Sequence, residues 1–235
     1  MFGFDIAIIS GAVPYIQSYF GWTELELGWG VSSLLMGAIF GSFGSGILTD
    51  KYGRKKVLIY VALFFALSCA MTALATSPLL FILSRIFGGL AVGAASVLSP
   101  MYVAEVAPPR IRGMLVAIYQ LAIVFGILCS YTINYWLHDA DNNWRWMFAT
   151  GIVPSVLFFA GLFFIPESPR WLYKAGRKDE SLMVLKRIGG DSLAEEEIKE
   201  IAKSLNESPG SVSRGELFKP ASRKRSEERR VGKEC

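Results

Sequence analysis

The chain has 235 residues, of which 52% are hydrophobic and 13% aromatic, and its mean hydropathy is +0.39. Water-soluble domains rarely carry so much apolar character, so the composition disfavours a soluble enzyme or binding domain and predicts a membrane protein. The formal net charge of +4 does not indicate a nucleic-acid partner, because several of these charges lie in the tail at 225–235.

Apolar windows of about 20 residues, the length at which a helix crosses about 30 Å of hydrocarbon, follow one another along the chain. We expect helices, because backbone polar groups in lipid must be satisfied within the segment and each window is too long for a barrel strand. Six crossings are therefore predicted in residues 1–166, and the start of the first is expected to be missing because almost nothing precedes Asp5. The windows run over 1–20, 27–48, 57–76, 79–101, 114–136 and 144–165.

The distribution of basic residues predicts the orientation. Lys and Arg are concentrated in every second connection, at 50–56, at 108–112 and after Pro169, whereas the connections between these are acidic or uncharged. Basic loops stay on the cytoplasmic side of a membrane, so both ends of the chain are expected inside the cell. Buried helices of one large soluble protein would not explain this alternation.

Residues 167–209 are charged and carry apolar residues at helix-face spacing, which predicts short amphipathic helices in a cytoplasmic domain. Asp191 or Ser192 with Glu195 resembles a capping signature for the last helix, which Pro209 and Gly210 would end. The stretch 210–224 then reads as the approach to a seventh span. We interpret 225–235 as an artefactual tail; a disordered basic tail that binds anionic lipid is the alternative.

The connection GILTDKYGRKK at 46–56 is too short for anything but antiparallel neighbouring helices. Gly46 is expected to permit close helix approach, and Asp50 and Arg54 to form charge-assisted hydrogen bonds next to Gly53. This pattern resembles the signature loop of the major facilitator superfamily. Three further motifs are similar to the sugar porter family, above all to bacterial proton-coupled pentose and hexose symporters: RIFGGLAVGAASVLSPMYVAEVAPPRIRG at 85–113, WRWMF at 144–148 and PESPRWL at 166–172.

The resemblance implies a bundle of twelve helices in two halves, with a sugar site between the halves and a cytoplasmic helical domain linking them. We therefore expect an all-α membrane protein: the N-terminal six-helix half of a major facilitator transporter plus short cytoplasmic helices. Its partners would be the missing C-terminal half and the lipid of a bacterial inner membrane, which the chain would cross several times. Transporters of this type rock one half against the other.

Asp5 is a carboxylate inside an apolar window, where a charge costs about 2.5 to 3.5 kcal/mol and is usually functional. Arg85 is the other ionisable residue well inside a window, and the fold that the resemblance implies brings the first and fourth helices together at the centre. Proton-coupled relatives carry a similar aspartate and arginine. We expect Asp5 to bind a proton when Arg85 withdraws, unless the two form a static pair that only fixes helix packing.

A sugar needs hydrogen-bonding groups in a dry pocket with aromatic walls. Gln120 is the first candidate, because the matching glutamine of the family binds a sugar hydroxyl, although a packing hydrogen bond would also explain it. Phe2 is expected to form an apolar wall, and Tyr131 and Asn134 are weaker candidates. Many relatives carry a second glutamine where this chain has Ile127, which leaves a pentose and a hexose both open.

The remaining polar groups are interpreted as gating or packing residues. The resemblance implies that Glu105, Arg112, Glu167 and Arg170 form a cytoplasmic network that locks the outward-facing state. Small residues in two stripes are expected to let helices approach closely: Gly37, Gly41, Gly44 and Ser45, with Gly88, Gly89 and Gly93.

The function predicted from these residues is transport of a monosaccharide by alternating access, as symport with a proton. A facilitative uniporter and a sugar receptor that does not transport are the alternatives. An enzyme is not expected, because only HDAD at 138–141 hints at paired carboxylates and it lies on an acidic outer loop. The cysteines have no spacing typical of a metal site or a disulfide, and no cofactor is predicted.

Overall fold

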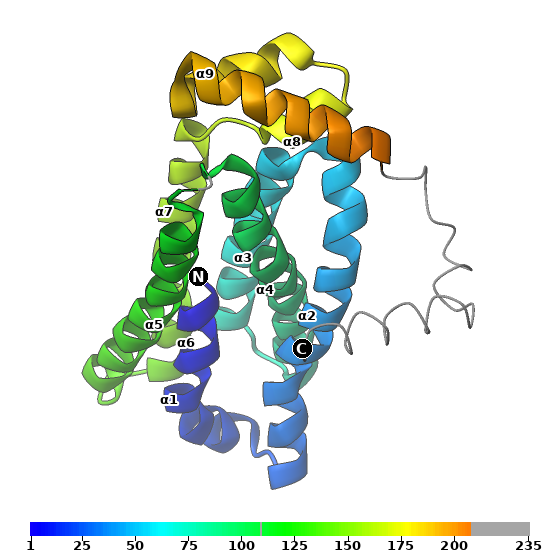
Figure 1. Cartoon of the computed structure of the whole chain (residues 1–235). Coiled ribbons are helices and arrows are strands. Elements are labelled where there is room, and N and C mark those ends of the chain that lie inside the picture. The colour runs from blue at the N-terminus through cyan, green and yellow to red at the C-terminus, as the bar shows by residue number, and fades with distance from the viewer. Residues whose placement is uncertain (109, 208–235) are drawn as a thin grey trace, which may run out of the picture.

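The computed structural model describes residues 1–108 and 110–207, which are helices joined by short connections (Figure 1). No strand occurs in these two ranges, so the predicted all-α architecture is confirmed. The predicted approach to a seventh span and the predicted tail lie outside the described residues. The helices are α1 (Phe2–Phe20), α2 (Glu24–Tyr52), α3 (Arg54–Ala73), α4 (Pro78–Val106), α5 (Arg112–Leu137), α6 (Asn143–Thr150), α7 (Ile152–Phe164), α8 (Pro169–Lys174) and α9 (Lys178–Glu207).

The long helices run side by side, and α8 and α9 lie across one end of the bundle (Figure 1). Helix α1 packs mainly against α5 and α6, whereas α4 packs mainly against α2 and α3. Helix α3 connects these two groups, because it also contacts α6 and α7. The bundle therefore consists of two helix groups with a limited direct contact between α1 and α4.

Within the described ranges, five segments are long and apolar enough to cross a membrane, judged by length and composition: α2, α3, α4, α5 and the stretch 143–164 that contains α6 and α7. They confirm the second to sixth predicted windows. The first window forms α1, which is not among them, because Asp5 and Gln17 dilute its apolar content. Eight residues of α1 are buried inside the bundle, Asp5 among them.

The sixth window is a helix in two pieces, which the sequence analysis did not predict. Helix α6 ends at Thr150 and α7 begins at Ile152. Pro154 lies in the first turn of α7, where proline is tolerated because the first N–H groups of a helix have no partner within it. Gly151 between the two pieces keeps helical backbone angles, with φ −61° and ψ −18°, so α6 and α7 follow one another within one apolar segment.

Helices α2 and α4 pack more extensively against each other than any other two helices in the described part of the chain. Gly37 and Gly41 on α2 face Gly89 and Gly93 on α4. A Cβ atom at any of them would collide with a backbone carbonyl oxygen of the opposite helix. Small residues spaced four apart let two helix backbones touch, so the predicted packing role is confirmed for these four glycines. The same expectation for Gly44 is wrong, because no described atom of another element lies within 4 Å of a Cβ atom built there.

Gly46 does not contribute to this contact, so the expectation that it permits close helix approach is wrong. Nothing lies within 4 Å of a Cβ atom built on Gly46. The inward face of α2 continues from Gly41 through Ser45 and Thr49, both buried, and Gly46 is turned about 100° away from that face.

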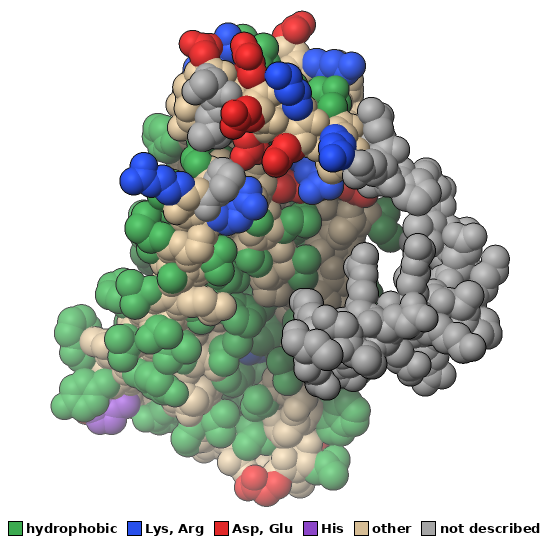
Figure 2. All heavy atoms as spheres, in the orientation of Figure 1, with side chains coloured by type: hydrophobic (Ala, Val, Ile, Leu, Met, Phe, Trp, Pro, Cys, Tyr) green, Lys and Arg blue, Asp and Glu red, His purple; other side chains and the backbone are tan. Residues whose placement is uncertain are grey.

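The charged side chains gather at the end of the bundle that carries α8 and α9, and the flank below them is mostly apolar (Figure 2). The α2–α3 turn and the connection from α4 to α5 lie at this same end (Figure 1). The described parts of the three basic regions therefore lie at the same end of the bundle.

Helix α9 is bent at Gly190, whose φ is +81°, so two helical pieces meet there. The second piece begins where Asp191 was predicted to cap it. The Asp191 carboxylate accepts a hydrogen bond from the Lys186 ammonium at 2.8 Å, and this contact raises the pKa of Lys186. Asp191 therefore joins the two pieces across the bend.

We predict that Gly41→Ala lowers the thermal stability of the complete carrier, because the new methyl group would meet the Leu90 carbonyl oxygen in a tightly packed contact. Overpacking of this kind typically costs about 1–3 kcal/mol. The control is Gly44→Ala on the same helix, where a Cβ atom has open space and alanine favours the helix. Thermal unfolding in detergent measures both; equal melting temperatures would contradict the packing argument.

Candidate functional site

Asp5 on α1 and Arg85 on α4 form a buried ion pair. The Arg85 Nη1 donates to the Asp5 Oδ1 at 2.9 Å, and the two residues are 3% and 2% exposed. Because α1 and α4 belong to different helix groups, this pair joins the two groups inside the bundle. The structure thus brings together the two ionisable residues that the sequence singled out, and their role in proton coupling stays a prediction.

A single hydrogen bond holds the pair. Neither Oδ2 of Asp5 nor Nε of Arg85 has a hydrogen-bond partner among the described residues. An arginine that binds a carboxylate with two parallel hydrogen bonds is held more firmly and in a fixed orientation. The Asp5–Arg85 pair therefore lacks part of the stabilisation that a fully satisfied buried pair would have.

Asn134 lies where α5 packs against α1. Its Nδ2 donates to the backbone oxygens of Ala7 and Ile8 at 3.4 and 3.3 Å, and a Cβ atom on Gly11 would collide with its amide. The residue is 8% exposed, and its Oδ1 has no hydrogen-bond partner in the described ranges. The structure therefore gives Asn134 a helix-packing contact instead of a place on an open surface.

Gln120 and Tyr131 lie on an exposed side of α5. They are eleven positions apart, which is about three helical turns, so they share one side of the helix. Gln120 is exposed, and Tyr131 is 54% exposed. A second body packed against this side of α5 would cover both side chains.

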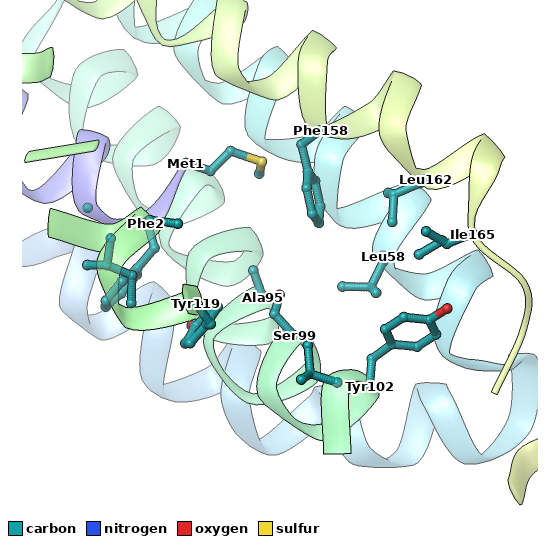
Figure 3. Close-up of a pocket in the computed structure, with 14 residues that line it drawn as sticks. Met1, Phe2, Leu58, Ala95, Ser99, Tyr102, Tyr119, Phe158, Leu162 and Ile165 are labelled. Carbon is teal, nitrogen blue, oxygen red and sulfur yellow. The ribbon is translucent and has the colours of Figure 1, made fainter. Parts of the chain in front are cut away.

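Phe2 lines a pocket of about 310 Å³ between α1, α3, α4, α5 and α7. The side chains around it are mostly apolar, with hydroxyl groups from Ser99, Tyr102 and Tyr119 (Figure 3). Gln120, Tyr131 and Asn134 are not among its lining residues. Of the four predicted sugar contacts, only Phe2 therefore lines this pocket.

Arg54 is the centre of a charge network at the α8–α9 end of the bundle. It is 7% exposed, and its guanidinium donates from Nε and Nη2 to the two carboxylate oxygens of Glu105, both at 3.0 Å. Its Nη1 donates to the backbone oxygen of Thr49 at 3.2 Å and approaches Asp50 at 3.5 Å. The predicted hydrogen bonding of Arg54 therefore ties α3 to both α4 and the end of α2.

Glu167 binds the start of α3. Its Oε1 accepts hydrogen bonds from the backbone N–H groups of Arg54, Lys55 and Ser168 at 2.8, 3.0 and 2.9 Å. The first N–H groups of a helix lack partners and carry partial positive charge, so a carboxylate is stabilised there. Gly53 precedes the helix with a φ of +94°, and a Cβ atom there would collide with the Glu167 carboxylate. Only glycine fits this position.

Arg112 and Arg170 do not join the network in this structure. Arg112 donates to the backbone oxygen of Ala107 at 3.4 Å, and Arg170 is exposed. Neither forms an ion pair with Glu105 or Glu167 in the described ranges, because Arg54 and backbone N–H groups already occupy these carboxylates. The expected group of four charges is thus replaced by Arg54 and the two glutamates.

Several residues that contact Glu105, Asp50 and Arg85 were not predicted from the sequence. The Ser168 hydroxyl donates to Glu105 at 2.6 Å, and Lys174 pairs with Asp50 at 3.3 Å. Serine followed by proline is a helix-start signal, and Ser168 does cap α8, so this residue could have been found. The ring of Phe148, which lies beneath Arg85, had no signal beyond the aromatic run WRWMF.

These features define an integral membrane bundle of the transporter type, with one buried ion pair at its centre and a charge network at one end. The family model described as "Sugar (and other) transporter" matches residues 1–226. The chain belongs to this family, whose members are transporters and not enzymes.

Curated relatives and solved structures agree with this assignment. The chain is 43% identical to an arabinose-proton symporter of Bacillus subtilis over 232 residues, covering 95% of this chain and 50% of the relative. It is 41% identical to a galactose-proton symporter of Escherichia coli, covering 87% of this chain and 44% of the relative.

A solved structure of the major facilitator superfamily proton:xylose symporter XylE is 36% identical, with a TM-score of 0.83, and covers 87% of this chain and 50% of that one. The predicted membership of this superfamily is therefore confirmed. The chain spans about half the length of the curated relatives it matches.

We predict that Glu105→Gln destabilises the complete carrier by about 3–5 kcal/mol, because it removes one charge of a largely buried pair and leaves Arg54 only its longer contact with the exposed Asp50. Asp50→Asn is the matched control, since the Asp50 side chain is 56% exposed and exposed pairs contribute about 0–1 kcal/mol. Thermal unfolding of both variants in detergent measures the difference. Equal losses would show that burial of the Arg54–Glu105 pair is unimportant.

Proposed function

We propose that the complete carrier transports a monosaccharide, a pentose or a hexose, by alternating access, and that one proton enters with the sugar. The observation that carries this proposal is the buried ion pair between Asp5 and Arg85, found in a chain of the sugar transporter family. Three relatives, an arabinose-, a galactose- and a xylose-proton symporter, support the substrate class.

The coupling follows from the energetics of a buried charge. Breaking a buried ion pair leaves an uncompensated charge, at a cost of about 3–5 kcal/mol. A carboxylate can avoid this cost by binding a proton, whereas an arginine cannot release one. When the two helix groups move and Arg85 withdraws, Asp5 is therefore the group that takes up a proton. The neutral side chain then presents no charge barrier to reorientation of the loaded carrier.

We infer that the sugar binds on the exposed side of α5, with Gln120 and Tyr131 on one wall and the second half of the transporter on the other. Polar side chains on a membrane helix normally face protein or a water-filled cavity, and both residues are exposed in this half. Phe2 and Asn134 would act through α1, the first as an apolar wall and the second by fixing the position of α5.

The charge network is proposed to set which way the carrier opens. Arg54, Glu105 and Glu167 join α3, α4 and the segment after α7, so these elements can separate only when the network breaks. By the positive-inside rule this end faces the cytoplasm of a bacterial cell, with both chain ends inside. Arg112 and Arg170 would find their partners in the other half or in another state.

Asp5→Asn in the complete carrier is expected to abolish accumulation of sugar against a gradient while sugar exchange across the membrane continues. The amide cannot be ionised, so no proton is released during the cycle and the sugar only equilibrates. Uptake and counterflow of radiolabelled sugar in proteoliposomes measure the two activities. The control is Asp139→Asn, which removes a carboxylate that is 85% exposed, and it should accumulate sugar normally.

Normal accumulation by Asp5→Asn would rule out the coupling role of Asp5. A parent carrier whose uptake equilibrates and does not respond to a protonophore would be a uniporter. Binding of sugar without any uptake would indicate a receptor. The three measurements therefore separate symport from both alternatives.

Gln120→Ala is expected to raise the KM for sugar by about tenfold, the equivalent of one lost hydrogen bond, while the maximal rate changes little. Gln17→Ala is the control, because Gln17 is a glutamine on α1 whose amide contacts Glu24 at 3.0 Å. Initial rates over a range of sugar concentrations give both constants. An unchanged KM with less carrier in the membrane would assign Gln120 to helix packing.

A further inference from the structure

Phe148 on α6 lies against the coupling pair without belonging to either of the helices that carry it. The Arg85 guanidinium carbon lies over the Phe148 ring, 5.3 Å from the ring centre. We propose that Phe148 is a positioning residue for proton coupling, whose ring face holds the Arg85 cation when Asp5 has taken up a proton. This inference rests on the proposed role of Asp5 and Arg85.

The ring is one of few groups available to stabilise Arg85. Apart from the single hydrogen bond to Asp5, no described group accepts a hydrogen bond from Arg85, and its Nε is buried without a partner. A cation over an aromatic face is attracted by the ring quadrupole, and most strongly where water is excluded. Phe148 is 2% exposed, so this contact is fully desolvated.

Whether Phe148 favours or opposes proton uptake by Asp5 depends on how strongly its ring attracts Arg85 in each state of the pair. With Asp5 ionised, the carboxylate already compensates the Arg85 cation that lies over the ring, through the hydrogen bond at 2.9 Å. With Asp5 protonated, the ring meets the Arg85 cation alone, so the attraction is larger. Phe148 therefore stabilises the protonated state of Asp5 more than the ionised state and favours proton uptake.

Phe148 is fixed by contacts that do not involve the pair. Its ring packs edge-on against Phe81, with ring centres 5.8 Å apart. One turn earlier on α6, Arg145 donates to the backbone oxygen of Ala73 at 2.8 Å and to the Tyr19 hydroxyl at 3.0 Å. These bonds anchor α6 to the ends of α3 and α1, so the position of the ring does not depend on the hydrogen bond between Arg85 and Asp5.

Few other titratable groups surround the pair. Among the described residues, the Cys69 thiol on α3 interacts electrostatically with both Asp5 and Arg85. The charged side chain of α6, Arg145, is bound at the end of α3 instead of facing the pair. Cys69→Ala therefore serves as a control for the other titratable side chain near Asp5.

The test replaces Phe148 in the complete carrier by phenylalanines with one, two and three ring fluorines, which keep the shape while removing the negative ring face stepwise. The readout is the external pH at which proton-driven sugar uptake is half-maximal. We expect this pH to fall with each fluorine and to move about one unit to the acid side in the trifluoro variant, equivalent to about 1.4 kcal/mol.

Phe65 provides the matched control. It is a phenylalanine of α3 that is 1% exposed, and no cation lies over its ring among the described residues. The same fluorinated series at Phe65, and Cys69→Ala, should leave the half-maximal pH unchanged. Phe148→Leu should shift the half-maximal pH to the acid side as far as the trifluoro variant does. The amount of this variant carrier in the membrane is compared with that of Phe65→Leu.

The outcomes separate this inference from the proposed function. If Asp5→Asn abolishes accumulation and the fluorinated Phe148 series leaves the pH profile unchanged, only the role of Phe148 is overturned. If Asp5→Asn accumulates sugar normally, the coupling role of the pair is overturned first. A shift that appears equally at Phe65 would assign the effect to packing and also overturn the inference.

Discussion

The buried contact between Asp5 and Arg85 constrains the rest of the structure, because two opposite charges in a low-dielectric interior are tolerated only while they stay within hydrogen-bonding distance. The residues lie on α1 and α4, which pack mainly against different neighbours. Helices α1 and α4 must therefore be held in fixed positions by their contacts with α5 and α2. Glycines at the α2–α4 contact fix α4, and Gly3, where a Cβ atom would collide with the Ile123 carbonyl oxygen, fixes α1 against α5.

The charge network at the α8–α9 end follows a different principle. Arg54 and Glu105 form two hydrogen bonds, and Glu167 is satisfied by N–H groups at the start of α3. These carboxylates have good hydrogen-bond partners, whereas Asp5 keeps one buried oxygen without any in the described part of the chain. The network is thus held by more hydrogen bonds than the central pair, which is the more deeply buried of the two.

The sequence predicted the features that depend on rare residues in an apolar background. Two ionisable residues inside apolar windows indicated the central contact, and glycines spaced by four indicated the α2–α4 contact. Apolar residues occur on all sides of α5, so its sequence does not show which side faces the interior of the bundle. The burial of Asn134 and the exposure of Gln120 could therefore not be predicted. The contacts of Arg112, Arg170 and Phe148 depend on tertiary packing, for which the sequence carries no local signal.

The arrangement also separates the proposed proton site from the proposed sugar site. Asp5 is buried, whereas Gln120 and Tyr131 lie on an exposed side of α5, so no single side chain would contact both ligands. If sugar binds Gln120, the most extensive contact through which it could act on Asp5 is that between α5 and α1, where Gly3 and Gly126 bring the backbones together and Asn134 binds the α1 carbonyls. Because these contacts involve backbone atoms, a shift of α5 moves α1 as a unit and changes the distance between Asp5 and Arg85. The coupling then requires a rigid α1–α5 contact more than a close approach of the two ligands.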